Sequence, residues 1–199
     1  MATGGLALWV LASSALGLAG VYLHPVALNF LPLLAGFLVP TLFVVALLWQ
    51  YRSFHSAVRS LILSVPLSWL LGVHCLRITA LGSILKYLDG ELPAHFILPV
   101  AVPDFLVGLS ALPLALWVSP EKPLGRWFLT AWNLAGSLVF VYAGLALHFS
   151  VSGPLQLFTS GPTTESIFRF PLVLVPTFLV PFFVGLHAAT LWRLSVRAA

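Results

Sequence analysis

Two opposite charges lie inside apolar stretches of this chain, and their types and spacing point most directly to chemistry. Arg77 lies in LLGVHCLRITALG and Asp104 lies in FILPVAVPDFLVG, on either side of the polar turn KYLDGELP. With a helical rise of about 1.5 Å per residue, Arg77 lies roughly 15 Å from Tyr87, and Asp104 lies roughly 16 Å from Pro93. We therefore expect both side chains at the same depth on consecutive antiparallel helices. An ionised group in an apolar environment is costly unless it is paired, so we predict an ion pair between them.

Three interpretations of these two charges are possible, and the sequence does not decide between them. In the first, the pair ties two helices together in register and has a structural role. In the second, it is the centre of a polar pocket or a proton path, in which Arg77 binds an anion and Asp104 takes up a proton. In the third, the two charges do not meet. A kink at Pro103 would also free the carbonyl of Pro99 as a further acceptor for the guanidinium.

A second set of polar residues, His74, Asn133 and His187, is expected near this pair. His74 lies one turn before Arg77, and the other two lie six or seven residues from the basic ends of their helices. All three therefore fall within roughly 10 Å of one end of the bundle. Two histidines at matching depth on different helices can be axial ligands of haem iron, so we keep a haem b electron carrier as an alternative. Histidines inside apolar helices more often bond a neighbouring side chain.

Three further histidines, His24, His95 and His148, are expected near the opposite ends of the helices. Three imidazoles that converge with a carboxylate can bind zinc or copper. These residues come from separate hairpins and lack the short spacing of metal ligands. We therefore predict no metal and no bound cofactor.

Signatures of familiar enzymes are absent from the sequence. It contains no H-E-x-x-H motif, no G-x-S-x-G motif, no glycine-rich phosphate loop and no D-x-x-D pair. These motifs supply the metal, the nucleophile or the phosphate contacts of common hydrolases and transferases. We therefore predict that the chain is not an enzyme.

The composition places these residues in a membrane protein. Of the 199 residues, 60% are hydrophobic and 7% are charged, whereas about a quarter of a typical soluble domain is charged. So few charged groups cannot cover a soluble fold of this size, and the excess apolar surface must face lipid. No connection is long enough for a second domain, so we expect one domain over residues 1–199. The net charge of +4 comes from basic residues scattered at helix ends, so no nucleic acid is expected.

Six apolar stretches are each long enough to cross a hydrocarbon core, which takes about 20 helical residues. They cover residues 6–23, 26–49, 58–87, 96–118, 127–149 and 170–192. The predicted fold is an all-α polytopic bundle of six transmembrane helices, several of them kinked by internal prolines. The fourth stretch has the most interruptions and is either continuous, broken or re-entrant. We expect the one long connection, residues 150–169, to be an ordered outer loop.

The basic residues set the expected orientation. One set of helix ends carries Arg52, Arg59, Lys122, Arg126, Arg193 and Arg197, and the other carries Lys86 and Arg169. Because basic residues favour the cytoplasmic side, we predict that both termini are cytoplasmic. The expected location is the inner (plasma) membrane of a bacterium.

The middle of the chain resembles a signature of small, uncharacterised bacterial membrane proteins. That signature is G-x-L-P-x-x-F-x-x-P-A-G-x-G-D-x-x-V-G-L-x-A, with an Arg one long helix earlier. Residues 90–99 read GELPAHFILP, and Asp104, VGL at 107–109 and Ala111 follow; where the family has P-A-G-x-G-D, this chain has PVAVPD. The later WNLAG at 132–136 and the closing Val180, Pro181 and His187 are also similar. The resemblance implies a six-span bundle built around the Arg/Asp hairpin, and it implies no activity.

These expectations lead to three functions that the sequence does not separate. The first is a non-enzymatic integral membrane protein, either an accessory or structural subunit or a bundle that binds a lipophilic molecule. The second is a small-solute or proton-coupled transporter that uses Arg77 and Asp104. The third is the haem b carrier, with His74 and His187 as ligands. The expected partners are the lipid bilayer and either another membrane protein or a second copy of the chain.

Overall fold

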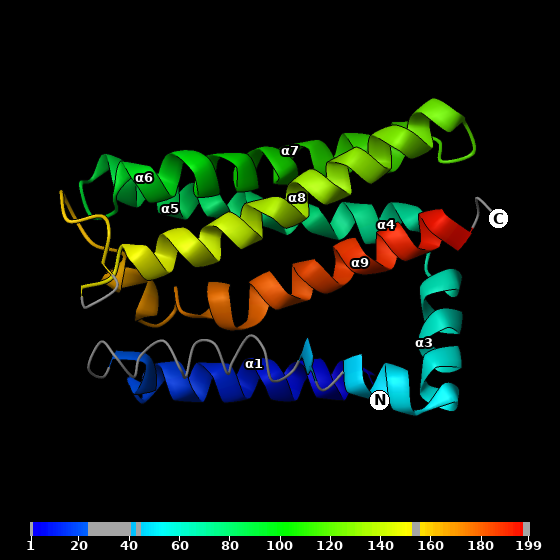
Figure 1. Ribbon diagram of the computed structural model, residues 1–199, viewed down its shortest axis with the longest axis horizontal. Coiled ribbons are helices and arrows are strands. Elements are labelled where there is room, and N and C mark those ends of the chain that lie inside the picture. The colour runs from blue at the N-terminus through cyan, green and yellow to red at the C-terminus, as the bar shows by residue number, and fades with distance from the viewer. Residues whose placement is uncertain (1, 24–40, 43–44, 153–155, 197–199) are drawn as a thin grey trace.

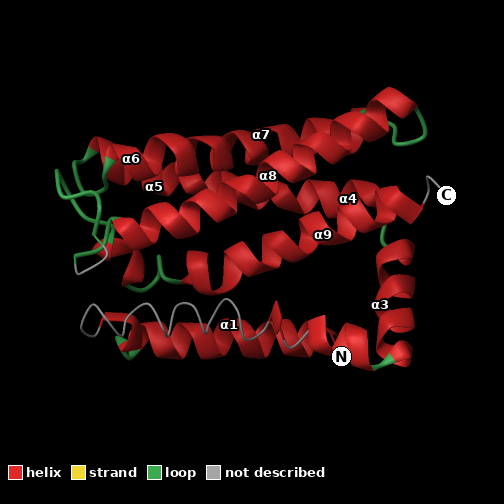
Figure 2. Cartoon of the chain, in the orientation of Figure 1, coloured by secondary structure: helices red, strands yellow, loops and turns green. Residues whose placement is uncertain are grey.

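The computed structural model of the chain describes residues 2–23, 41–42, 45–152 and 156–196, and this part is helical without a strand (Figure 2). Its α-helices with described bounds are α1 (Ala2–Leu18), α3 (Arg52–Ser64), α4 (Leu67–Gly72), α5 (Leu81–Leu88), α6 (Ala94–Phe96), α7 (Val102–Trp117), α8 (Pro123–Phe149) and α9 (Val180–Val196). The 3₁₀ segments are η1 (Val21–Leu23), η2 (Val73–Ala80) and η4 (Glu165–Phe168), and the π-helical segments are η3 (Ile97–Ala101) and η5 (Val175–Leu179). The predicted all-α class is confirmed for these residues.

Four continuous runs of these elements are long and apolar enough to cross a membrane. They are Leu67–Leu88, Ala94–Trp117, Pro123–Phe149 and Val175–Val196. They lie side by side along the long axis of the bundle (Figure 1), and α1 packs against η5. Trp9 of α1 packs edge-on against Phe178, with 5.3 Å between ring centroids. The length and apolar composition of these helices indicate a helical membrane protein.

Three of the predicted spans agree closely with these helices. The stretches predicted at 96–118, 127–149 and 170–192 correspond to the second, third and fourth runs, whose bounds differ from the predicted ones by a few residues. The first predicted span, residues 6–23, is covered by α1 and η1. Most of the second, residues 26–49, lies outside the described residues.

The prediction of the third span, residues 58–87, is wrong in its first part. Residues 58–64 belong to α3, which runs across the end of the bundle at a steep angle to the other helices (Figure 1). The membrane-length helix begins only at Leu67. Pro66 separates the two because proline has no N–H and disfavours a helical conformation in the residue before it.

Prolines change the helix type in the fourth predicted span but do not interrupt it. Pro103 lacks an N–H, and the turn before it is the π-helical segment η3, closed by a hydrogen bond from the Val102 N–H to the Ile97 carbonyl. Ala94–Trp117 is therefore one continuous helical run. Neither the broken nor the re-entrant alternative applies.

The two ends of the bundle differ in charge. The start of α1 and the end of α9 lie at the same end, together with α3 and the connection between α7 and α8 (Figure 1). This end, which we call the basic end, carries Arg52, Arg59, Lys122, Arg126 and Arg193. The opposite end holds the turn between α5 and α6 and the connection between α8 and η5. That connection folds against α8, since the buried Thr164 hydroxyl donates to the Leu147 carbonyl at 3.0 Å.

Two apolar clusters form the core. The cluster toward the basic end consists of Leu71, Leu114, Leu129 and Leu194. The cluster toward the opposite end consists of Tyr22, Leu92, Phe96, Ile97, Val100, Ala101, Ala146, Leu147, Ile167, Phe168 and Val173. Buried polar side chains lie between the two clusters along the helices, and they include Arg77, Asn133 and His187. The polar layer is thus closed by apolar packing on both sides.

Candidate functional site

The predicted ion pair between Arg77 and Asp104 is confirmed. Arg77 Nε donates to Asp104 Oδ1 at 2.6 Å, and Arg77 Nη2 lies 2.5 Å from the same oxygen. The arginine is 1% exposed, whereas the Asp104 side chain is 19% exposed. The pair joins η2 to the first turn of α7.

A glycine allows these two helices to approach closely. A Cβ atom at Gly108 would lie 2.6 Å from the Ile78 backbone nitrogen and 2.9 Å from the Arg77 carbonyl carbon. Gly108 lies one turn after Asp104, on the same side of α7. The missing side chain therefore lets the backbone that carries Arg77 come near enough for its guanidinium to reach the carboxylate.

The two terminal nitrogen atoms of the guanidinium, Nη1 and Nη2, also contact two other helices. Arg77 Nη1 lies 2.8 Å from His187 Nε2 in α9, and Nη2 donates to the Gly136 carbonyl in α8 at 3.3 Å. The Phe140 ring lies beneath the guanidinium, with 4.2 Å from Cζ to the ring centroid. Each of the three guanidinium nitrogens thus has an acceptor. The carbonyl that Arg77 uses is that of Gly136 and not that of Pro99.

The donors around His187 can be assigned from chemistry. A guanidinium has no acceptor, so His187 Nε2 accepts the hydrogen bond from Arg77 and the proton of the neutral ring is on Nδ1. His187 Nδ1 therefore donates to Asn133 Oδ1 at 2.8 Å, and Asn133 Nδ2 donates to the Leu129 carbonyl at 2.7 Å. We call Arg77, Asp104, Asn133, Gly136 and His187 the buried network. Every hydrogen bond in this network has one donor and one acceptor in a single consistent assignment. Such a network favours one arrangement of the four helical runs that it joins.

Gly136 provides the space in which His187 meets Arg77. A Cβ atom at this position would lie 2.6 Å from His187 Cε1, 2.7 Å from His187 Nε2 and 3.3 Å from Arg77 Nη1. No real Cβ atom tolerates the first two distances. Gly136 therefore has two functions in the network, because its carbonyl is an acceptor and its lack of a side chain admits the imidazole.

His74 lies next to the network but is not hydrogen-bonded to it. Its ring stacks on His187 with 4.1 Å between centroids, and it contacts the edge of Trp132 at 5.4 Å. The residue is fully buried, and neither ring nitrogen has a hydrogen-bond partner among the described residues. An unsatisfied buried polar group lowers stability, so His74 is a weak point in an otherwise closed arrangement.

The structure brings together all five residues expected in the buried polar site: Arg77, Asp104, His74, Asn133 and His187. Gly136, which appears above only within the WNLAG resemblance, and Phe140 were not among the predicted site residues. Both lie on the Asn133 face of α8, at intervals of three and seven residues, so helical periodicity was a usable signal. Their roles depend on contacts with other helices, which periodicity does not reveal.

The stacked histidines do not have the geometry of a haem site. Axial ligands approach the iron from opposite sides of the porphyrin, with a nitrogen of each ring directed at the metal. The His74 and His187 rings instead lie 4.1 Å apart with 28° between their planes, and both nitrogens of His187 are hydrogen-bonded. No porphyrin fits between rings in this contact.

The histidines of the opposite end do not form a metal site in the described part of the chain. His95 Nε2 lies 2.7 Å from Ser150 Oγ, and its ring stacks on Phe158. His148 lies in the last turn of α8, and His24 lies outside the described residues. Among the residues that the structure describes, no group of three or more His, Cys, Asp or Glu could hold a metal ion.

Comparison with known proteins gives one finding. A family model described as a domain of unknown function, DUF8737, matches residues 34–195. Comparisons with curated proteins and with solved structures give no match. The matched residues include the whole buried network, His74 and α3, and they make up more than half of the sequence. The chain therefore belongs to the DUF8737 family.

Proposed function

We propose that this chain is a non-catalytic integral membrane protein that acts as a structural or accessory subunit in the plasma membrane. The observation that carries this proposal is the closure of the buried network. The guanidinium of Arg77 bonds three helices, and apolar clusters lie on both sides of the polar layer. A pocket beside Arg59 and Trp192 at the basic end and a pocket beside Lys86 and Glu165 at the opposite end both lack any network residue in their linings. Such an arrangement suits a rigid scaffold.

The outer surface of the bundle supports a packing role. Only 22% to 33% of the most apolar stretch of each long helix is buried inside the chain. Large side chains such as Leu106, Leu109 and Leu138 are about half exposed or more. This surface is available to lipid, to a lipophilic molecule or to another transmembrane helix.

The Asp104 carboxylate is a partly exposed polar group at that surface. Both contacts of Arg77 go to Oδ1, and Oδ2 accepts no hydrogen bond among the described residues. Polar side chains inside the membrane contribute to helix association by hydrogen-bonding across the interface. A hydrogen-bond donor from a partner helix could therefore bond to Oδ2.

The proposal can be tested by measuring the mass of the native assembly. The full chain, extracted in a mild detergent, should run as a stoichiometric complex with itself or with another membrane protein. Asp104→Asn should weaken that complex, whereas the matched Asp89→Asn in the turn after α5 should not. A monomer without a companion, in both the natural chain and the variants, would contradict the proposal.

One observation favours a second candidate, a small-solute or proton-coupled transporter. Asp104, Arg77, His187 and Asn133 form a continuous chain of polar contacts across the bundle, and the unpartnered His74 stacks on it. This is more extensive than an isolated ion pair, and proton paths in membranes are built from such chains. In reconstituted vesicles, transport would require Asp104, so Asp104→Asn should abolish pH-driven uptake while the helical content is unchanged. Equal uptake by this variant and by Asp89→Asn would exclude the role.

A further inference from the structure

Helix α3 is amphipathic and contains no buried residue. Arg52 and Arg59 lie on one face of it, and both are exposed. Phe54, Val58 and Ile62 follow one another at intervals of four residues on another face, and they are half-buried. No acidic residue occurs in the helix. One side of α3 is therefore basic and polar, and the other is apolar.

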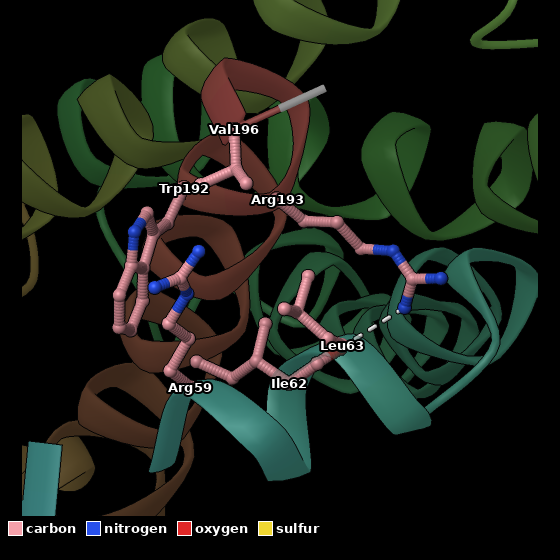
Figure 3. Close-up of a pocket in the computed structure, with 6 residues that line it drawn as sticks. All are labelled: Arg59, Ile62, Leu63, Trp192, Arg193 and Val196. Atoms are coloured by element: carbon pink, nitrogen blue, oxygen red, sulfur yellow. Dashed lines mark hydrogen bonds between the residues drawn. The ribbon is translucent and has the colours of Figure 1, made fainter. Parts of the chain in front are cut away.

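Arg193 fixes α3 across the end of the bundle. Pro66 has no N–H, so the Ile62 carbonyl, four residues earlier, lacks its usual helical donor. Arg193 Nη1, from the last turn of α9, donates to this carbonyl at 3.0 Å and also to the Val65 carbonyl. Figure 3 shows Arg193 extending from α9 to the end of α3. The steep angle between α3 and the long helices is thus held by a nearly buried guanidinium.

Aromatic side chains gather at the same end. A shallow hollow between α3 and α9 is lined by Arg59, Ile62, Leu63, Trp192, Arg193 and Val196 (Figure 3). The His55 ring lies 5.3 Å from the Trp192 ring. Trp49 and Trp127 are 92% and 69% exposed. Tryptophan is enriched where the hydrocarbon meets the headgroups, so these side chains favour a position of α3 at the depth of the headgroups.

We propose that α3 lies in the plane of the membrane and that Arg52 and Arg59 bind the phosphate groups of anionic phospholipids. A helix across the bundle axis is parallel to the membrane, and its apolar face then rests on the acyl chains. The guanidinium presents paired donors that match phosphate oxygens. The surplus of positive charge on α3 favours anionic over zwitterionic lipids. This inference rests on the membrane location and not on the role of the buried network.

Lipid selectivity tests the proposal directly. The full chain is reconstituted in nanodiscs with equal amounts of phosphatidylglycerol and phosphatidylcholine, released gently, and the lipids that stay bound are counted by native mass spectrometry. The natural chain should retain mainly phosphatidylglycerol. Arg52→Gln with Arg59→Gln should reduce the relative affinity for phosphatidylglycerol by about 30-fold, because each basic residue near the surface contributes about a factor of five.

The matched control is Lys86→Gln with Arg169→Gln, which removes two cations from the opposite end. This variant should keep the preference for phosphatidylglycerol. An unchanged preference in the α3 variant, or an equal loss in both variants, would overturn the proposal. The same spectra report the number of chains, so loss of a dimer without loss of bound lipid would instead assign α3 to contact with a second copy.

Depth measurement gives a second, independent readout. Spin labels are placed at Ser56 on the polar face and at Leu61, which is 53% exposed, in a Cys75→Ala background. In vesicles, the label at Leu61 should be accessible to oxygen, and the label at Ser56 should be accessible to a water-soluble nickel reagent. Equal access of the nickel reagent to both positions would place α3 in water and refute the proposal.

Discussion

Gly136→Ala should disrupt the buried network by adding a single methyl group. The new Cβ would lie 2.6 Å from His187 Cε1 and 2.7 Å from His187 Nε2, whereas carbon atoms in contact are separated by about 3.5–4.0 Å. The imidazole, or α8 itself, must therefore move by about 1 Å. A shift of this size breaks the 2.8 Å contact between His187 Nε2 and Arg77 Nη1.

The expected loss of stability follows from three contributions. Overpacking of this kind costs about 1–3 kcal/mol. Loss of a hydrogen bond to a charged group costs about 1.5–3 kcal/mol. Alanine is favoured over glycine inside a helix by about 0.5–1 kcal/mol, which offsets part of this. The net destabilisation by Gly136→Ala is therefore about 2–5 kcal/mol.

The same helix offers the control. Gly144 also lies in α8, and a Cβ atom there would meet nothing within 4 Å among the described residues. Gly144→Ala should therefore be neutral or slightly stabilising. The assay is reversible unfolding of the full chain in mixed micelles, followed by far-ultraviolet circular dichroism. If Gly136→Ala unfolds at the same denaturant concentration as Gly144→Ala, the close contact between α8 and His187 is refuted.

Three further substitutions test other contacts in the same unfolding assay. His74→Phe replaces a buried imidazole that has no hydrogen bond among the described residues, so it should stabilise the chain by about 1–3 kcal/mol; destabilisation would mean that the imidazole has a partner. Arg193→Gln removes a charged donor to the Ile62 carbonyl and should lower stability by about 1.5–3 kcal/mol; unfolding at the same denaturant concentration as the natural chain would contradict this role of Arg193. Trp132→Phe removes the 2.9 Å hydrogen bond from Nε1 to Ser110 Oγ and should cost about 1 kcal/mol, whereas a value near zero would show that this bond does not tie α7 to α8.

The charged centre of the site was predictable because charge in an apolar helix is unusual. Counting residues from the polar turn placed Arg77 and Asp104 at one depth, and the contact at 2.6 Å agrees with that count. His74, Asn133 and His187 were found in the same way. Depth alone did not show that Arg77 would bond His187 directly and leave His74 only stacked.

The fold was harder to predict where amphipathic and apolar sequence adjoin. Residues 58–87 form one apolar stretch when averaged, and the polar side chains of α3 are too few to separate it from the following helix. Pro66 was visible, but proline within a membrane helix usually produces only a kink. Pro66 ends α3, and the steep angle of α3 is then held by the Arg193 guanidinium, whose approach from α9 is a tertiary contact. The choice of the Gly136 carbonyl as an acceptor is likewise set by the packing of α8.

The most direct test of the buried ion pair is a double-mutant cycle with Arg77→Met, Asp104→Leu and the combined variant. Each single change leaves one charge without its partner in the interior of the bundle and should cost about 3–5 kcal/mol of unfolding free energy. The combined variant has no orphaned charge, so it should be more stable than Arg77→Met alone. If the combined variant is as unstable as the sum of the two single changes, Arg77 and Asp104 do not stabilise each other and the network has no charged centre.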